Sequence, residues 1–181
     1  MNCSKTLPII PRDCEGNIGG VKEIYVANKS AVGDMFIIEN DGSTFDENSS
    51  LGNVFVRYVV PRGAATFGTT SVINRETGAN YFDNTVVIAL NKLSPDGKYA
   101  LTLSGLSLGE FVIVVRDNND VLHLVGFVGE GAMATDGSST TGAAFTDRNG
   151  ETITLTASEP TPAPVNSWDN LGSFIEENTK S

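Results

Sequence analysis

Short apolar runs alternate along this chain with clusters of glycine, asparagine, aspartate and serine, a pattern typical of strands joined by turns. The run Val54–Val60 shows this best, because its apolar side chains recur with period two and Arg57 falls on the opposite face. Val21–Ala27 and Asp34–Glu39 are two further predicted strands. Residues 40–53 are predicted to be a polar loop with almost no core-forming residue. The face of Val54–Val60 predicted to be buried consists of Val54, Val56, Tyr58 and Val60.

Two longer segments predict a β-hairpin in the middle of the chain. Ala64–Glu76 and Asn80–Asn91 are separated by a three-residue turn around Gly78, which suits a tight connection. Gly109–Arg116 is apolar on both faces, which indicates a central strand that is covered on both sides. A polar turn follows, and Val121–Val128 is predicted to return as the partner of that strand.

One segment has helical periodicity instead. Lys92–Gly105 begins with Ser94 and Pro95, residues that favour the first positions of a helix. Its apolar residues fall at i, i+4 and i+7 and form one stripe. Because its glycines weaken an isolated helix, we expect it to dock on a sheet. The stripe consists of Tyr99, Leu103 and Leu106.

The chain changes character after its last predicted strand. Residues 129–143 are small and are predicted to form a strand or a loop, and Glu151–Ala157 then alternates with Ile153 and Leu155 inward and threonines outward. A proline-rich spacer follows, and Ser167 suits the N-cap of a short final helix.

An apolar stripe on this final helix is formed by Trp168, Leu171 and Ile175. Two interpretations are open: the stripe folds back onto its own core, or it packs on a neighbouring subunit. We take these three residues as candidate assembly contacts, because burial of such side chains contributes about 1.5–3 kcal/mol each. Deletion of residues 160–181 is therefore expected to weaken assembly and to leave the fold intact.

Together these elements predict a mainly β fold, an antiparallel sandwich or barrel with one flanking α-helix. Residues 1–20, with their prolines and glycines, are predicted to be an irregular N-terminal arm. Residues 21–158 form the predicted β domain, and residues 159–181 form the spacer and the short helical arm.

Charge and composition exclude several classes of function. The 181 residues hold 12 Lys and Arg against 22 Asp and Glu, a net charge of −10, which disfavours general binding to phosphates. No apolar run approaches the length of a membrane-spanning helix, and the first residues lack the pattern of a secretory signal, so we expect neither membrane association nor export.

The residues for catalysis or metal binding are few. Cys3 and Cys14 are expected to be reduced thiols, although a bridge between them stays possible, and His123 is the single histidine, placed in a strand pattern. Zinc sites need three or four ligands and a Ser-His-Asp triad needs a nucleophile motif, neither of which this sequence offers. The acidic turns do not follow the spacing of a calcium loop. We expect no enzymatic activity, no metal and no cofactor.

The order of the segments resembles the tail-tube (major tail) proteins of bacteriophages, in particular those of phages and prophages of Bacteroides-type bacteria. The stretches that carry the resemblance are GNIGGVKEIYVAN, YFDNTVVIALNKLS, FVIVVRDNNDVLHLVGFVGEGA and TTGAAFTDRNGETITLTASE, within residues 16–158. The acidic extension after Ser158 departs from the family pattern.

The resemblance implies a β-sandwich or barrel with one flanking helix, a virion protein of the tail that is made in the host bacterial cytoplasm. It implies self-association into rings, usually hexamers, that stack into a tube through which genome DNA passes without specific binding, next to other tail or connector proteins. The alternatives are a head-to-tail connector of the same fold and a monomeric β-sandwich binding module. If DNA slides through the ring, its lumen is expected to be acidic or neutral.

Overall fold

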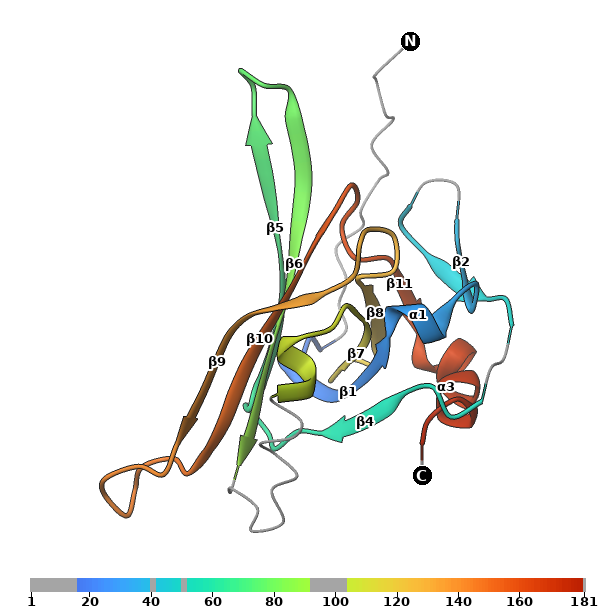
Figure 1. Ribbon diagram of the computed structural model, residues 1–181. Coiled ribbons are helices and arrows are strands. Elements are labelled where there is room, and N and C mark those ends of the chain that lie inside the picture. The colour runs from blue at the N-terminus through green and yellow to red at the C-terminus, as the bar shows by residue number, and fades with distance from the viewer. Residues whose placement is uncertain (1–15, 40–41, 50–51, 92–103, 181) are drawn as a thin grey trace.

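The computed structural model describes residues 16–39, 42–49, 52–91 and 104–180 and is mainly β, with 52% strand and 12% helix (Figure 1). Every pair of neighbouring strands is antiparallel. The prediction of a mainly β, antiparallel fold with few helices is therefore confirmed. Cys3 and Cys14 lie outside the described residues, as does most of the predicted N-terminal arm.

The first sheet has five strands in the order β11-β8-β7-β1-β4. Its centre is β7 (Phe111–Asp117), whose first five residues are all buried, as predicted for a strand covered on both faces. The predicted return strand is β8, and it pairs with β7. The other strands are β1 (Val21–Asn28), β4 (Val56–Val59), β8 (Val121–Val125) and β11 (Val165–Ser167).

The second sheet has four longer strands in the order β5-β6-β10-β9. Its hairpin of β5 (Ala65–Asn74) and β6 (Ala79–Asn91) is the one that the sequence predicts, and Gly78 in its turn has a φ of +73°, which glycine adopts without strain. β10 (Gly150–Glu159) and β9 (Met133–Thr140) complete the sheet. The segment predicted as a strand or a loop is thus in large part a strand.

The first core lies between the two sheets. Ile24 and Ile113 from the five-stranded sheet face Val86 and Leu155 from the four-stranded sheet, and all four are at most 3% exposed. A short helical turn at 104–107 adds Leu106 to this core. The rest of the helix predicted over Lys92–Gly105 lies outside the described residues.

A second core lies on the opposite face of the five-stranded sheet. It is covered by α3 (Trp168–Glu177), α1 (Lys29–Val32) and the hairpin of β2 (Phe36–Ile38) and β3 (Phe45–Glu47). The ring of Phe36 lies 5.5 Å from that of Phe45 and 5.9 Å from that of Phe174, centroid to centroid. The prediction of a polar loop over residues 40–53 is wrong for Phe45–Glu47, which form β3, whereas the expectation of almost no core-forming residue agrees with Phe45 being the one buried residue in the described part of this range. A single phenylalanine in a polar run is buried here because β3 pairs with β2 above the sheet.

The four-stranded sheet is longer than the core that it covers. The β5–β6 hairpin extends beyond the sandwich at one end, and the β9–β10 hairpin extends beyond it at the other (Figure 1). Residues 68–71 and 73–81 of the first hairpin are exposed on both faces of the ribbon. These two projecting hairpins distinguish the molecule from a closed sandwich.

Candidate assembly surface

The apolar stripe of the C-terminal helix is part of the chain's own core. Leu171 and Ile175 are 1% and 0% exposed and pack with the second core, and Trp168 packs against the same cluster. Of the two open interpretations, the structure has the first, in which the helix folds back. The interpretation as assembly contacts is corrected accordingly: Leu171 and Ile175 are buried in their own domain and offer no surface to a partner, and Trp168 is partly buried against the same cluster.

The segment predicted as a free spacer also belongs to the domain. Its last residues form β11, which pairs with β8 over Val165–Ser167 and leads directly into α3. Ser167 is the N-cap residue, as predicted, although its side chain makes no capping hydrogen bond. Residues 165–177 therefore complete the five-stranded sheet and cover it.

The indole ring of Trp168 packs against Arg116 and Tyr25 of the sheet and against Gly172 of its own helix. The guanidinium carbon of Arg116 lies 3.6 Å from the centroid of the indole, and the ring of Tyr25 is stacked 6.1 Å away. A Cβ at Gly172 would approach the indole to 2.6 Å, so the ring packs on this helix only because position 172 is a glycine. Cation–π contacts of this kind contribute about 0.5–2 kcal/mol.

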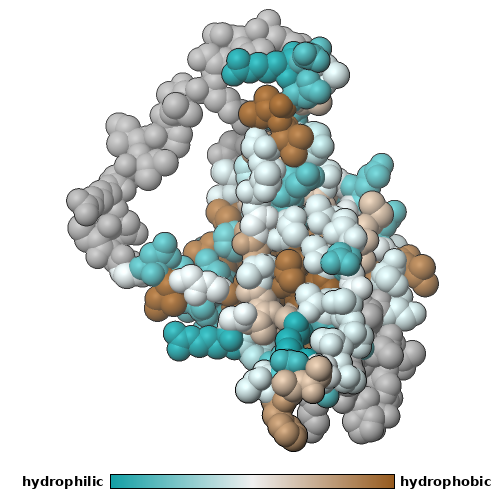
Figure 2. All heavy atoms as spheres, turned by 90° about the vertical axis from the view of Figure 1, so that its left-hand side faces the viewer, coloured by the Kyte–Doolittle hydropathy of each residue, from teal (hydrophilic) through white to brown (hydrophobic). Residues whose placement is uncertain are grey.

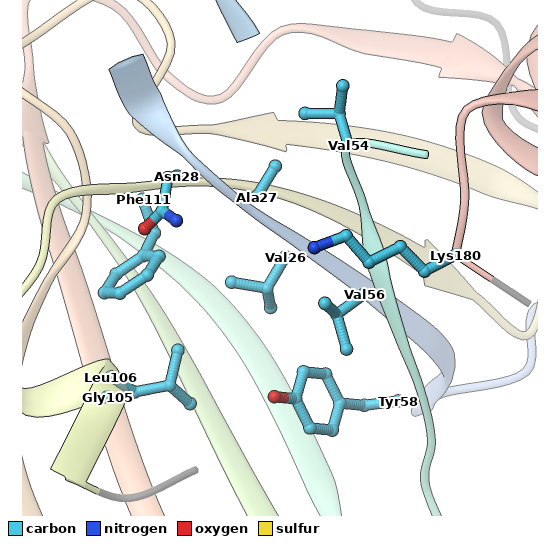
Figure 3. A pocket seen from close by; sticks show the side chains of 10 residues that line it. All are labelled: Val26, Ala27, Asn28, Val54, Val56, Tyr58, Gly105, Leu106, Phe111 and Lys180. Atoms are coloured by element: carbon cyan, nitrogen blue, oxygen red, sulfur yellow. The ribbon is translucent and has the colours of Figure 1, made fainter. Parts of the chain in front are cut away.

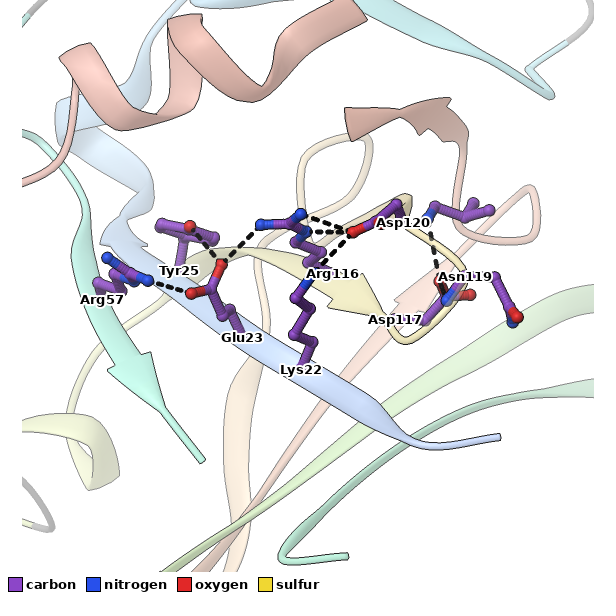
Figure 4. A network of polar contacts seen from close by, with 9 residues as sticks. Lys22, Glu23, Tyr25, Arg57, Arg116, Asp117, Asn119 and Asp120 are labelled. Atoms are coloured by element: carbon purple, nitrogen blue, oxygen red, sulfur yellow. Dashed lines mark hydrogen bonds and ion pairs between the residues drawn. The ribbon is translucent and has the colours of Figure 1, made fainter. Parts of the chain in front are cut away.

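A buried carboxylate organises the polar contacts beneath α3 (Figure 4). Glu23 on β1 is 6% exposed and accepts hydrogen bonds from Arg57 on β4, from the Tyr25 hydroxyl at 2.9 Å and from Arg116 on β7 at 3.1 Å. Arg116 also donates to Asp120 at 2.7 Å. The network joins three strands to the turn after β7.

These contacts change the acidity of the groups. Burial alone would raise the pKa of Glu23, but hydrogen bonds from Arg57, Tyr25 and Arg116 outweigh it and lower the pKa below the ordinary value. Burial and the neighbouring carboxylate raise the pKa of Tyr25. Hydrogen bonds from Arg116 and Lys22 lower the pKa of Asp120. At neutral pH Glu23 and Asp120 are therefore carboxylates and Tyr25 is a neutral phenol that donates its proton to a hydrogen bond. Each carboxylate has partners within the network, which indicates a role in stability.

The outward face of the four-stranded sheet carries few charged groups, in contrast to the network beneath α3. Its four strands contain Asp83, Asp136, Glu151 and Glu159 and neither lysine nor arginine. Two of these carboxylates, Glu151 and Glu159, are 6% and 1% exposed and lie on the inner side. Threonines dominate the outer side of β10, and Figure 2, which looks onto this face, shows mostly pale spheres of near-neutral hydropathy. It is a broad, weakly acidic surface of small side chains.

Both outer edges of this sheet are open among the described residues. No described strand pairs with the outer edge of β5 or of β9. The Ala89 N–H donates to the Ala64 carbonyl, and hydrogen-bonded pairs alternate along an antiparallel ladder. The even-numbered residues of β5 therefore bond to β6, and the odd-numbered ones point their N–H and C=O groups away from the sheet.

A groove with a volume of about 250 Å³ lies beside β1 and β4 (Figure 3). Most of its lining residues are apolar, and the polar groups are the Asn28 amide, the Tyr58 hydroxyl and the Lys180 amine, with no carboxylate or histidine among the described residues that line it. His123 lies elsewhere, on β8, with Nε2 3.4 Å from Asp117 Oδ2 and its ring against Phe67. No cluster of three or more His, Cys, Asp or Glu within the described ranges could hold a metal ion.

Sequence reasoning missed the part of the surface that the structure leaves open. The stripe of Trp168, Leu171 and Ile175 is apolar and helical in period, which predicts a contact. The open edges belong to strands of ordinary composition. The signal available was the lack of lysine and arginine in all four strands, since edge strands commonly carry such charges. Among the described residues, no helix has the length and apolar composition needed to cross a membrane.

Comparison with known proteins found no match. No family model matches this sequence, and neither a curated protein nor a solved structure matches it.

Proposed function

We propose that this chain is a structural, non-enzymatic virion protein that assembles edge to edge into rings, as the tail-tube proteins that it resembles do, and that the rings conduct DNA. The observation that carries the proposal is the four-stranded sheet with two open edges, whose hairpins project beyond their own core. Long open edges of this kind promote pairing with another chain unless a protein blunts them.

The directions of the strands allow the sheet to close on itself. β5 is antiparallel to β6, β6 to β10 and β10 to β9, so β5 and β9 run in opposite directions. A rotation about an axis roughly along the strands keeps these directions. The outer edge of β5 in one copy then meets β9 of the next as an antiparallel pair, and a closed ring leaves no edge.

The chemistry of the outward face suits a lumen for DNA. Grip on DNA comes from lysine and arginine contacts to phosphates, and the four strands contain no such residue. The net charge of −10 per chain adds a repulsive field. The outer side of the strands carries threonines and the carboxylates of Asp83 and Asp136. The Arg148 guanidinium, which lies against Thr152, is already engaged in hydrogen bonds within the chain, so this surface suits the passage of DNA without tight binding.

Negative-stain microscopy of the purified chain tests the proposal. We expect annular particles or stacked tubes, and their formation should be favoured by salt, which screens repulsion between acidic subunits beyond about 10 Å at 0.1 M. A chain that stays monomeric at high concentration in all salts would contradict ring formation. Measurable turnover of a substrate would contradict the non-enzymatic assignment.

A head-to-tail connector of the same fold is the second candidate. Such a layer forms single rings that do not stack on copies of themselves, whereas a tail-tube subunit forms stacks. The same micrographs separate the two.

A further inference from the structure

The tip of the β9–β10 hairpin is a fixed turn. The carboxylate of Asp147 accepts the N–H groups of Ala143 at 2.9 Å and Ala144 at 2.8 Å, and these hydrogen bonds lower its pKa. Gly142 has a φ of +70°, in the left-handed region that favours glycine. The tip therefore presents its remaining side chains in one defined arrangement.

Arg148 fastens this tip to the sheet. Its guanidinium donates to Thr152 Oγ1 at 2.6 Å, to the Leu90 carbonyl at 3.2 Å and to Asn91 Oδ1 at 3.2 Å. The two charged side chains of the tip, Asp147 and Arg148, thus both form hydrogen bonds within the chain.

Phe145 is the apolar side chain that this tip exposes. Its relative exposure is 110%, which makes it the most exposed large hydrophobic residue among those described. Large aromatic side chains held in a fixed position act as anchors in protein interfaces. A phenylalanine on a hydrogen-bonded turn that none of the described residues covers suits a contact with another molecule.

A groove of about 520 Å³ lies at the other end of the same sheet. None of the described residues that line it is charged, and its apolar walls are formed by Phe82, Pro160, Pro162 and Ala163. Thr161 Oγ1, beside them, is the one buried side-chain oxygen or nitrogen without a hydrogen-bond partner in the described part of the chain. The groove combines an apolar wall with the polar side chains of Ser43, Asn80 and Thr161, and it is large enough for a phenyl ring.

Phe145 cannot reach the groove of its own chain. The tip precedes Gly150, where β10 begins, and the groove begins at Pro160, directly after β10 ends. The ten residues of β10 separate the two features by roughly 30 Å.

We propose that Phe145 of one copy inserts into the groove beside Pro160 and Pro162 of a second copy that lies further along the strand direction. The contact joins different surfaces, and repetition of such a heterologous contact along an axis gives an open stack. The inference rests on the proposed function and specifies how one ring holds the next, with edge pairing of β5 and β9 acting within each ring.

Two variants and one cross-linker test this contact. Phe145→Ser should weaken each subunit contact between rings about ten- to hundred-fold, the loss expected when one buried phenylalanine is removed, and the stacking of whole rings by more, since every subunit loses its contact. Leu108→Ser is the matched control, since Leu108 is 88% exposed and lies outside the groove and the tip, and it should stack as the unmodified chain does. Stack length in micrographs and sedimentation velocity are the readouts. A photoreactive benzoylphenylalanine at position 145 should cross-link to residues 80–82 or 160–163 of another copy.

The outcomes separate this inference from the proposed function. If the unmodified chain forms no rings, the proposed function fails, and the cross-link is then scored in concentrated solution. Stacks that persist with Phe145→Ser, or cross-links that map to other residues, overturn the contact while ring formation stands. Single rings with Phe145→Ser and stacks with Leu108→Ser support it.

Discussion

The two sheets of this molecule differ in what covers their outer faces. The outer face of the five-stranded sheet is buried by α3, α1 and the β2–β3 hairpin, all from the same chain. The outer face of the four-stranded sheet has no such cover among the described residues, and its edges are open as well. The chain itself covers the outer face of one sheet, and under the proposed function other copies would pair with the edges of the other.

The composition of each face explains how the single chain can stay folded in water with one face covered and the other exposed. The covered face carries large apolar groups such as Tyr25, Phe55 and Leu124, which would aggregate if exposed. The open face carries threonines, whose β-branched side chains favour strands without adding a large apolar patch. The open sheet can therefore stay folded in water and still offer backbone groups to a partner.

The largest difference between the regions should appear in stability. Ile175→Ala should lower the free energy of unfolding by about 2–5 kcal/mol, because Ile175 is 0% exposed in the second core. Val59→Ala is the control, since Val59 is 66% exposed, and its cost should be below about 0.5 kcal/mol. Urea denaturation monitored by circular dichroism measures both. Equal stability of the two variants would contradict the placement of α3 in the core.

The regions also differ in how far the sequence predicted them. The β5–β6 hairpin and the central strand β7 follow from local patterns, apolar alternation around Gly78 and a run that is apolar on both faces, and both are confirmed. The polar residues around Phe45 do not distinguish it from a loop residue, because its burial depends on the pairing of β3 with β2 and on α3, which lies far away in the sequence.

The candidate site was harder to predict for a related reason. An apolar stripe such as Trp168, Leu171 and Ile175 shows that a surface will be buried and not which chain will bury it. The pairing of β11 with β8 decides this, and three residues of ordinary composition carry that pairing. Open edges and the exposure of Phe145 depend on which strands lie next to each other, which periodicity does not reveal.

The second largest effect concerns the charges under α3. Glu23→Gln should lower the free energy of unfolding by about 1.5–3 kcal/mol, the range for hydrogen bonds to a charged group, because Arg57 and Arg116 lose their shared carboxylate. Glu47→Gln on the exposed end of β3 is the matched control and should change little. Thermal unfolding of both variants at pH 7 measures the difference.

The same group gives a dependence on pH. The pKa of Glu23 is lower in the folded protein than its ordinary value of 4.5, so its contribution is fully present above pH 4.5 and is lost as the pH falls through the folded pKa. The melting temperature of the unmodified chain should drop more steeply below pH 4.5 than that of Glu23→Gln. Parallel curves for the two would show that Glu23 is not responsible.

A smaller effect is expected at the open edge. Ser71 is exposed, and its N–H points away from β6, so Ser71→Pro removes an outward donor and no ladder hydrogen bond. We expect each subunit contact to weaken by about 0.5–1.5 kcal/mol, with the melting temperature of the monomer nearly unchanged. Ser71→Ala keeps the N–H and is the control. Assembly is followed by sedimentation against concentration, and rings of undiminished stability with Ser71→Pro would place the contact at another edge.

The smallest change in stability, within about 0.5 kcal/mol, should come from Thr154→Lys on the outward face of β10. Its effect on DNA should still be measurable, because each lysine that contacts a phosphate adds close to one unit to the salt dependence of binding. Assembled rings of this variant should retain duplex DNA at low ionic strength and release it as salt rises. Glu47→Lys raises the net charge by more, yet it lies on β3, on the covered side of the molecule, and should not retain DNA. Equal retention by both variants would show that total charge decides binding and that the outward face does not line the channel. Tight binding by the unmodified rings at ordinary salt would contradict passive conduction altogether.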